Sequence, residues 1–214
     1  MFNIKALLAQ IDLFVYAAEK ESLPENSDNL STILKNIEKL ETYKARKAYA
    51  EKNLEHLSSG SSRIVYLTTD KTVIKLAKND KGIAQNKAEA NPKVKSKYIN
   101  KIIGKAKNYS WIQTAYLDKL TEKEFEEITG INFEDFGDCI KYGLRELSSS
   151  KKKKPSTFDG ISKTEIYKEI EKVGKKNSLM GGDFARISSY GVKDGHPVLI
   201  DTGLTKQIFE SLYE

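Results

Sequence analysis

The spacing of apolar residues divides the chain into a helical start, a strand-rich middle and a mostly helical second half. Apolar residues recur at helical spacing over residues 3–20, which predicts an amphipathic helix. After the polar break SLPENSDN, the same spacing predicts a second helix from about Thr32 to Leu57, with Ile33 and Ile37 on its apolar face. The chain therefore opens with two helices.

The pattern then changes to short β-branched runs. RIVYLTT and KTVIKLAK are predicted to form two strands joined by a turn at 69–71. Residues 81–90 read as a short helix that Pro92 stops. YINKIIGKAKN and YSWIQTAYL are predicted to form two further strands. Sequential hairpins of this kind favour an antiparallel sheet.

Helical spacing returns after Leu120. TEKEFEEITGINFEDFGDCIKYGLREL reads as a helix, and Thr121 with Glu124 forms a plausible capping box at its start. A further helix is predicted from about Ser162 to Lys175. The last section holds a loop, a strand HPVLID and a terminal helix.

This order predicts an α+β fold with two lobes, a small antiparallel sheet lobe and a reduced helical lobe. We expect residues 1–57 to form an N-terminal helical extension and residues 58–120 a small nucleotide-binding sheet lobe. Residues 121–214 are then the reduced helical lobe, which contains the last loop and strand.

Composition excludes several classes of protein. The single cysteine, Cys139, rules out an internal disulfide framework and a multi-cysteine zinc site, and its apolar surroundings favour a buried structural thiol. With only His56 and His196, a histidine-rich metal site is not expected. No apolar run reaches the length of a membrane span, so no membrane partner and a cytoplasmic setting are expected.

The net charge of +6 permits anionic partners without specifying one. The densest basic run, Lys151–Lys154, lies among Ser, Pro, Thr and Gly, which favours a solvated loop over a docking segment. A nucleic-acid-binding reading could use this run and the lysines of 93–107. The sequence lacks an aromatic-interleaved basic motif and a recognisable reading helix, so nucleic acid is not the expected partner.

Two features of the middle section could bind phosphate. A loop of small residues in LSSGSSRIVY would let the backbone approach phosphate groups, although a plain hairpin turn explains it as well. Lys75 lies within the apolar run TVIKL. If Lys75 lies on an exposed face of the sheet, it is an ordinary solvent-facing lysine. If it lies on a buried face, it needs an anionic partner.

Three carboxylates could complete such a site. Glu89 is acidic within KGIAQNKAEA and could pair with Lys75, or lie on the surface. Asp183 follows two glycines in a loop, and Asp201 follows the apolar run VLI. A carboxylate at the end of a buried strand caps a turn or binds a cation, and both remain open for Asp201.

Taken in order from about Leu57 to Leu204, these motifs resemble the protein-kinase-like fold, including its small aminoglycoside-phosphotransferase-like and bacteriophage members. The resemblance implies that Gly60 and Ser61 belong to the glycine-rich loop over the phosphates and that Val65 covers the adenine. It also implies that Lys75 contacts phosphate and that Glu89 positions Lys75.

The same resemblance extends to the second half of the chain. It places Tyr116 and Leu117 at the hinge beside the adenine. It makes Asp183 the carboxylate that orients the acceptor hydroxyl, with Arg186 neutralising charge on the phosphoryl group. Asp201 becomes a magnesium ligand, and Ser188 takes the position of the family's metal-binding asparagine.

Some positions depart from the family pattern. Ser58 and Arg63 stand where the first and third glycines of the loop are expected. Gly181 replaces the histidine of the catalytic loop, and Thr202 follows Asp201 in place of phenylalanine. These departures weaken the match at the phosphate loop and the metal site.

The leading interpretation is a minimal kinase-like phosphotransferase that uses ATP and magnesium, with a protein Ser/Thr or a small molecule as acceptor. The alternative is a catalytically weak or inactive pseudokinase-type protein that binds a partner, for instance a phage regulator of a host protein. Both interpretations require Lys75, Glu89, Asp183 and Asp201 to converge.

Overall fold

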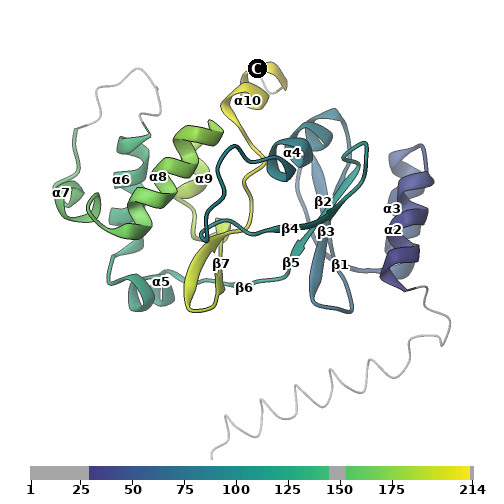
Figure 1. Cartoon of the computed structure of the whole chain (residues 1–214), viewed down its shortest axis with the longest axis horizontal. Helices are drawn as coiled ribbons and strands as arrows, with labels where there is room; N and C mark the ends of the chain where they lie inside the picture. The colour runs from purple at the N-terminus through teal and green to yellow at the C-terminus, as the bar shows by residue number, and fades with distance from the viewer. Residues whose placement is uncertain (1–28, 145–152, 213–214) are drawn as a thin grey trace, which may run out of the picture.

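A computed structural model describes residues 29–144 and 153–212. The chain has a sheet lobe and a helical lobe that lie side by side, with helices α2 and α3 at the outer end of the sheet (Figure 1). The predicted α+β class is confirmed. The helix expected over 3–20 and the lysines at 151 and 152 lie outside the described residues.

The sheet lobe contains five strands in the order β1-β2-β3-β5-β4, and every neighbouring pair is antiparallel. They are β1 (Glu55–Ser59), β2 (Arg63–Leu67), β3 (Thr72–Ala77), β4 (Ile102–Lys105) and β5 (Trp111–Ala115). Lys75 lies in the central strand, opposite Val65 of β2 and Ile112 of β5. The predicted antiparallel sheet is therefore confirmed, and its register puts Lys75 at the middle.

The two faces of the sheet have different partners, because side chains alternate along a strand. On the outer face Ile64, Tyr66, Ile74 and Leu76 form one apolar core with residues of α2 (Leu30–Lys39) and α3 (Tyr43–Asn53). The inner face, which includes Lys75, packs against α4 (Asp80–Ala90). The N-terminal helices thus cover the face opposite to the one that carries the candidate chemistry.

The single helix predicted over 32–57 is wrong in two respects. The chain breaks between α2 and α3, where the Thr42 hydroxyl accepts from the Ala45 N–H and caps the second helix. Arg46 Nη1 holds the break by donating to the Leu40 and Glu41 carbonyls at 3.0 and 2.9 Å. The end of the predicted helix is instead edge strand β1.

The helical lobe surrounds a second apolar core that is rich in aromatic residues. Its helices are α5 (Glu122–Thr129), α6 (Phe133–Gly143), α7 (Phe158–Ile161), α8 (Glu165–Asn177), α9 (Gly181–Phe184) and α10 (Lys206–Leu212). Strands β6 (Asp118–Lys119), β7 (Tyr190–Lys193) and β8 (His196–Leu199) form a small antiparallel sheet. Cys139 is fully buried in this core, as expected for a structural thiol.

The long helix predicted after Leu120 is two helices. Gly130 ends α5 in the left-handed conformation at φ 69°, which glycine adopts without steric cost. The Asn132 side chain then caps α6 by accepting from backbone N–H groups. The capping box of Thr121 and Glu124 is confirmed at the start of α5.

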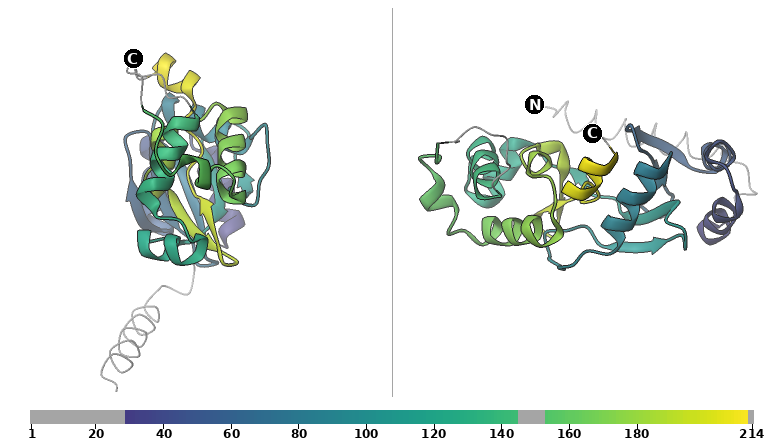
Figure 2. Two further views of the ribbon diagram at one scale, coloured as in Figure 1. Left: turned by 90° about the vertical axis from the view of Figure 1, so that its left-hand side faces the viewer. Right: turned by 90° about the horizontal axis from the view of Figure 1, so that it is seen from above.

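Backbone contacts join the two lobes. The Leu199 N–H of β8 donates to the Tyr98 carbonyl at 2.8 Å, and the Leu199 carbonyl accepts from the Asn100 N–H at 2.9 Å. Helix α10 lies beside α4, as the view from above shows (Figure 2). The segment between β8 and α10, which contains Asp201, is therefore held against the sheet lobe. Within the described ranges, no helix combines the length and apolarity that crossing a membrane requires.

Candidate functional site

Lys75 is buried on the inner face of the sheet, with 6% of the residue exposed. Its ammonium donates to Glu89 Oε1 of α4 at 2.5 Å and to the Ile200 carbonyl. Glu89 is 4% exposed, so both charges have left water together. A buried ammonium is stable only with such partners. Of the two positions that the sequence allows for Lys75, exposed or buried with an anionic partner, the structure has the second.

Helix α4 reaches the sheet closely because its facing side is small or polar. Asn79 caps the helix, and a methyl group added at Gly82 would collide with the Ser62 carbonyl. Asn86 is fully buried and its amide donates to the Lys75 carbonyl at 3.2 Å. These contacts fix the rotation of α4, and the same rotation turns Glu89 toward Lys75.

Arg63 is a site residue that the sequence analysis recorded only as a replacement for glycine. It is the first residue of β2 and only 6% exposed. Its Nη1 donates to Glu89 Oε2 at 2.7 Å and its Nη2 donates to Asp201 Oδ1 at 2.6 Å. The sequence does contain a signal for this role: Arg63 and Val65 are two residues apart on one strand, so Arg63 shares the face of Val65, which was expected to cover the adenine.

Asp201 completes a group that we call the charged cluster: Arg63, Lys75, Glu89 and Asp201. Asp201 Oδ1 also accepts from the Gly203 N–H at 3.2 Å, while the side chain as a whole is 53% exposed. Burial would raise the pKa of Asp201, but the positive charges of Arg63 and Lys75 outweigh it and hold that pKa well below its usual value. The carboxylate is therefore ionised at neutral pH.

Gly203 allows the chain after Asp201 to lie against α4. A methyl carbon at this position would be 2.9 Å from the Gln85 carbonyl oxygen and 3.1 Å from Arg63 Nη1. The contact with the Gln85 backbone is too short for a real Cβ and the one with Arg63 is tight, so a larger residue would push the segment away from the helix. Glycine at this position thus keeps Asp201 within reach of Arg63.

Asp183 lies in the short helix α9. The chain just before this helix runs beside the segment that follows Asp201. The Met180 N–H donates to the Leu204 carbonyl at 3.2 Å, which pairs the two segments. Phe184 is buried and its carbonyl accepts from the Tyr190 hydroxyl at 3.0 Å, which anchors the loop in the helical-lobe core. The Asp183 side chain is 32% exposed, and Arg186 Nη1 lies 3.6 Å from its Oδ1. The backbone pairing therefore places Asp183 next to the segment that follows Asp201.

Ser188 is exposed on a 3₁₀ turn (Ile187–Ser189). With Arg186 it lines a hollow of about 430 Å³ that also borders Glu134 and Asp138 of α6. The neighbouring Ser189 carbonyl accepts from the Ile200 N–H, but no hydrogen bond joins Ser188 to Asp201 in the described residues. The hydrogen bond between Ser189 and Ile200 brings the backbone next to Ser188 alongside the backbone next to Asp201, and a shared metal at these two residues stays a prediction.

The donors at Asp201 do not fit a magnesium ion in this arrangement. Magnesium prefers near-octahedral oxygen ligands. Oδ1 of Asp201 already accepts from Arg63 and Gly203, so a cation at this carboxylate would have Oδ2 alone as a ligand that is not already hydrogen-bonded in the described residues. Across residues 29–144 and 153–212, no three His, Cys, Asp or Glu side chains are grouped to hold a metal ion.

The residues expected around a nucleotide lie on the inner side of the sheet or at its border. Gly60 and Ser61 are exposed in a short turn between β1 and β2, which Lys78 holds by donating to the Gly60 carbonyl. Val65 is half-buried directly opposite Lys75. Tyr116 is 36% exposed in the connection to β6.

Leu117 is also in that connection and is half-buried. It packs against Gly191 of β7, where an added methyl carbon would lie 2.6 Å from the Leu117 Cβ. Leu117 is therefore held where the sheet lobe passes into the small sheet of the helical lobe.

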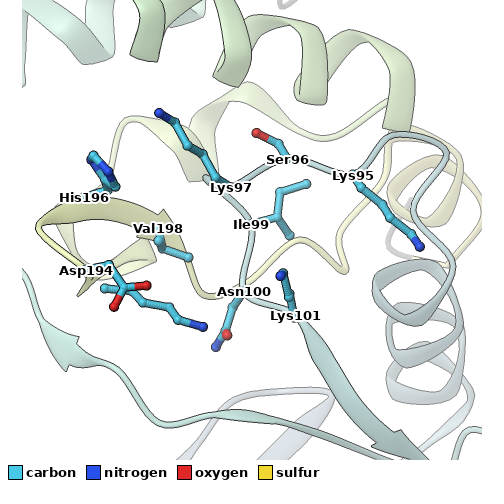
Figure 3. A pocket seen from close by; sticks show the side chains of 10 residues that line it. Lys95, Ser96, Lys97, Ile99, Asn100, Lys101, Asp194, His196 and Val198 are labelled. Atoms are coloured by element: carbon cyan, nitrogen blue, oxygen red, sulfur yellow. The ribbon is translucent and has the colours of Figure 1, made fainter.

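A second cavity of about 430 Å³ opens between residues 95–101 and the β7–β8 hairpin (Figure 3). Four of its ten lining residues are lysines, Lys95, Lys97, Lys101 and Lys193, and Asp194 and His196 also line it. Lys97 is already paired with Glu165 of α8 at 2.8 Å. None of the candidate site residues lines this cavity.

Comparison with known proteins gives distant structural similarities. No protein-family model and no curated protein matches the sequence. The chain is similar to a crystal structure of ADP-bound aminoglycoside phosphotransferase APH(2'')-Ib, at 14% identity and a TM-score of 0.35, over 75% of this chain and 70% of that one. It is also similar to a streptomycin–ATP–APH(2'')-IIa ternary complex, at 15% identity and a TM-score of 0.34, over 77% of this chain and 71% of that one.

The topology of the chain agrees with the protein-kinase-like fold that the sequence resembles. An antiparallel sheet carries a central lysine, the following helix supplies the glutamate that pairs with it, and a loop with two strands leads to the Asp-Thr-Gly segment.

Proposed function

We propose that the chain is a kinase-like phosphotransferase whose charged cluster binds the phosphates of ATP. The observation that carries this proposal is the buried Lys75–Glu89 ion pair, held 2.5 Å apart between the central strand and α4. Burying two opposite charges where apolar residues would pack as well is costly, so such a pair is retained where a function requires it. The ionised Asp201 carboxylate is linked to the pair through Arg63, and this extended charge network supports a functional site over an isolated ion pair.

Each residue then has a role that its position allows. Lys75 donates to phosphate oxygens, and Glu89 holds the ammonium in place. Gly60, Ser61 and Val65 cover the nucleotide from above, and Tyr116 and Leu117 border its base. These contacts orient the triphosphate, which is most of what catalysis of phosphoryl transfer asks of a protein.

Asp183 acts on the acceptor. ATP supplies the phosphoryl group and leaves as ADP. The acceptor oxygen forms a bond to the γ-phosphorus, the bond from that phosphorus to the β–γ bridging oxygen breaks, and Asp183 accepts the hydroxyl proton. Arg186, exposed beside Asp183, offsets charge on the phosphoryl oxygens. Magnesium has no role in this proposal, because the donors at Asp201 do not fit it.

A transfer assay tests this proposal. The full chain is incubated with ATP and either Ser/Thr peptides or hydroxyl-bearing small molecules, and products are followed by mass spectrometry. Transfer by the natural chain that is lost in Asp183→Asn, while ATP binding persists, supports the assignment. Equal transfer by both chains contradicts the role given to Asp183.

A second candidate is a pseudokinase-type protein that binds a partner, including a host protein, and transfers phosphate weakly or not at all. The charged cluster favours it, because two carboxylates already neutralise the two cations and leave little net attraction for a triphosphate. ATP binding without transfer to any acceptor supports this candidate. Efficient transfer excludes it.

A further inference from the structure

Arg63 stands at the point where the sheet lobe, α4 and the Asp201 segment meet. Its guanidinium contacts one carboxylate on each side, Glu89 at 2.7 Å and Asp201 at 2.6 Å. The side chain is only 7% exposed, so little water competes with these contacts. A planar guanidinium with several N–H donors can bridge two carboxylates in this way, whereas a lysine ammonium is a single point charge.

The position of this charge resembles that of a bound cation. Carboxylate oxygens are ligands that hard divalent cations prefer, and here Asp201 Oδ1 accepts from the Arg63 guanidinium at 2.6 Å instead. The guanidinium supplies positive charge to Asp201 and connects it to Glu89, and through Glu89 to Lys75. Nothing else in the described cluster carries positive charge to Asp201 by direct contact.

Local packing keeps Arg63 in place. Its Nη1 also lies 3.4 Å from Asn86 Oδ1, within hydrogen-bond reach. Gly203 leaves room for the guanidinium, because a Cβ there would sit 3.1 Å from Nη1. Antiparallel pairing with Ala77 fixes the backbone at the start of β2. The arginine is therefore built into the site from three elements.

We propose that the Arg63 guanidinium takes the place of a divalent cation at Asp201, so that the site binds nucleoside phosphates without magnesium. This inference rests on the proposed nucleotide binding. Removing the guanidinium frees Asp201 Oδ1 and converts the site into one that binds a divalent cation.

The first experiment measures metal binding alone, which makes it independent of nucleotide binding. Manganese is titrated into the natural chain, Arg63→Gln and the double variant Arg63→Gln/Asp201→Asn, and free manganese is followed by electron paramagnetic resonance. We expect Arg63→Gln to bind manganese at least about tenfold more tightly than the natural chain, since a charge-assisted contact to the carboxylate has been removed. The double variant loses this gain.

The second experiment measures ATP affinity in magnesium and in EDTA by calorimetry. We expect the natural chain to bind ATP with affinities in the two buffers that differ by less than about threefold, and Arg63→Gln to prefer the magnesium buffer by about tenfold or more. If no chain binds ATP, the proposed function fails and the manganese titration alone decides this inference.

Controls keep both results interpretable. Arg46→Gln removes another buried guanidinium, in α3 on the other side of the sheet, and should leave metal binding unchanged. Circular dichroism confirms that each variant is folded, and Arg63→Met serves as a second variant if glutamine is not tolerated. Manganese binding of equal strength in the natural chain and in both Arg63 variants overturns the proposal, as does ATP binding by the natural chain that EDTA abolishes.

Discussion

Arg63 and Asp201 are 138 positions apart in the chain and lie 2.6 Å apart across the junction of the two lobes. This contact links the first residue of β2 to the segment between β8 and α10. Together with the Lys75–Glu89 pair and the Arg63–Glu89 contact, it forms a continuous chain of ion pairs on the inner face of the sheet. Several consequences for stability and binding can be measured.

Glu89 is the carboxylate that both buried cations share, so its loss should matter most. We expect Glu89→Gln to lower the free energy of unfolding by about 3–5 kcal/mol, because it leaves Lys75 without its carboxylate and Arg63 with only one. Lys75→Met should cost less, since Glu89 keeps Arg63. Urea unfolding of the natural chain and the two variants measures which substitution lowers the free energy of unfolding more. A larger decrease in Lys75→Met than in Glu89→Gln contradicts the shared-carboxylate arrangement.

Gly203 should tolerate no side chain. We expect Gly203→Ala to destabilise the chain by about 1–3 kcal/mol, as overpacking in a close contact does. The matched control is Gly160→Ala in α7, where an added Cβ meets no atom within 4 Å. Thermal melting that shows equal effects of the two substitutions would mean that the Asp201 segment is not packed against α4.

Helix α2 should contribute to the sheet lobe as a core element. Ile37 is fully buried against the outer face of the sheet, so Ile37→Ala should cost about 2–5 kcal/mol. Lys35→Ala, on the exposed side of the same helix, should change stability by less than about 0.5 kcal/mol. Denaturant unfolding compares them. A small effect at Ile37 would show that α2 does not pack on the sheet.

Cys139 gives a pH dependence with a defined sign. Burial raises the pKa of its thiol, so the folded state favours the protonated form. Stability is unaffected by this group below the ordinary thiol pKa of about 8.5 and falls as pH rises above it, because the unfolded chain ionises first. Urea midpoints between pH 7 and 10 should fall more steeply for the natural chain than for Cys139→Ala. Equal slopes would contradict a raised pKa.

Elements with strong local signals were predictable from the sequence. The strands around Lys75, the α4 region and the capping box at Thr121 follow from alternation, helical spacing and capping chemistry. The helix breaks at Thr42 and Gly130 were missed, because helix-favouring residues continue on both sides of each break. The hydrogen bonds that cap the new helices leave no trace in the spacing of apolar residues. Strand β1 was missed for a related reason: all its residues are exposed, so it has no apolar alternation.

The charged cluster was predictable in part. Lys75, Glu89 and Asp201 stand out by their apolar or strand-end surroundings, and the structure brings them into one network. The role of Arg63 depends on a contact over 138 positions, which no local pattern encodes. Ser188 stands five residues after Asp183 and lies on a 3₁₀ turn at a hollow beside α6, so its role as a metal ligand stays a prediction. Tertiary geometry, not spacing, decides the position of Arg63.

Calorimetric titration of ATP into the natural chain and into Lys75→Met tests the central claim most directly, when run in both magnesium and EDTA. The account predicts saturable binding of one ATP per natural chain, and a loss of affinity of about tenfold or more in folded Lys75→Met, because the ammonium that contacts phosphate is gone. Absence of binding by the natural chain at millimolar ATP in both buffers, or equal binding by the two chains, would contradict it.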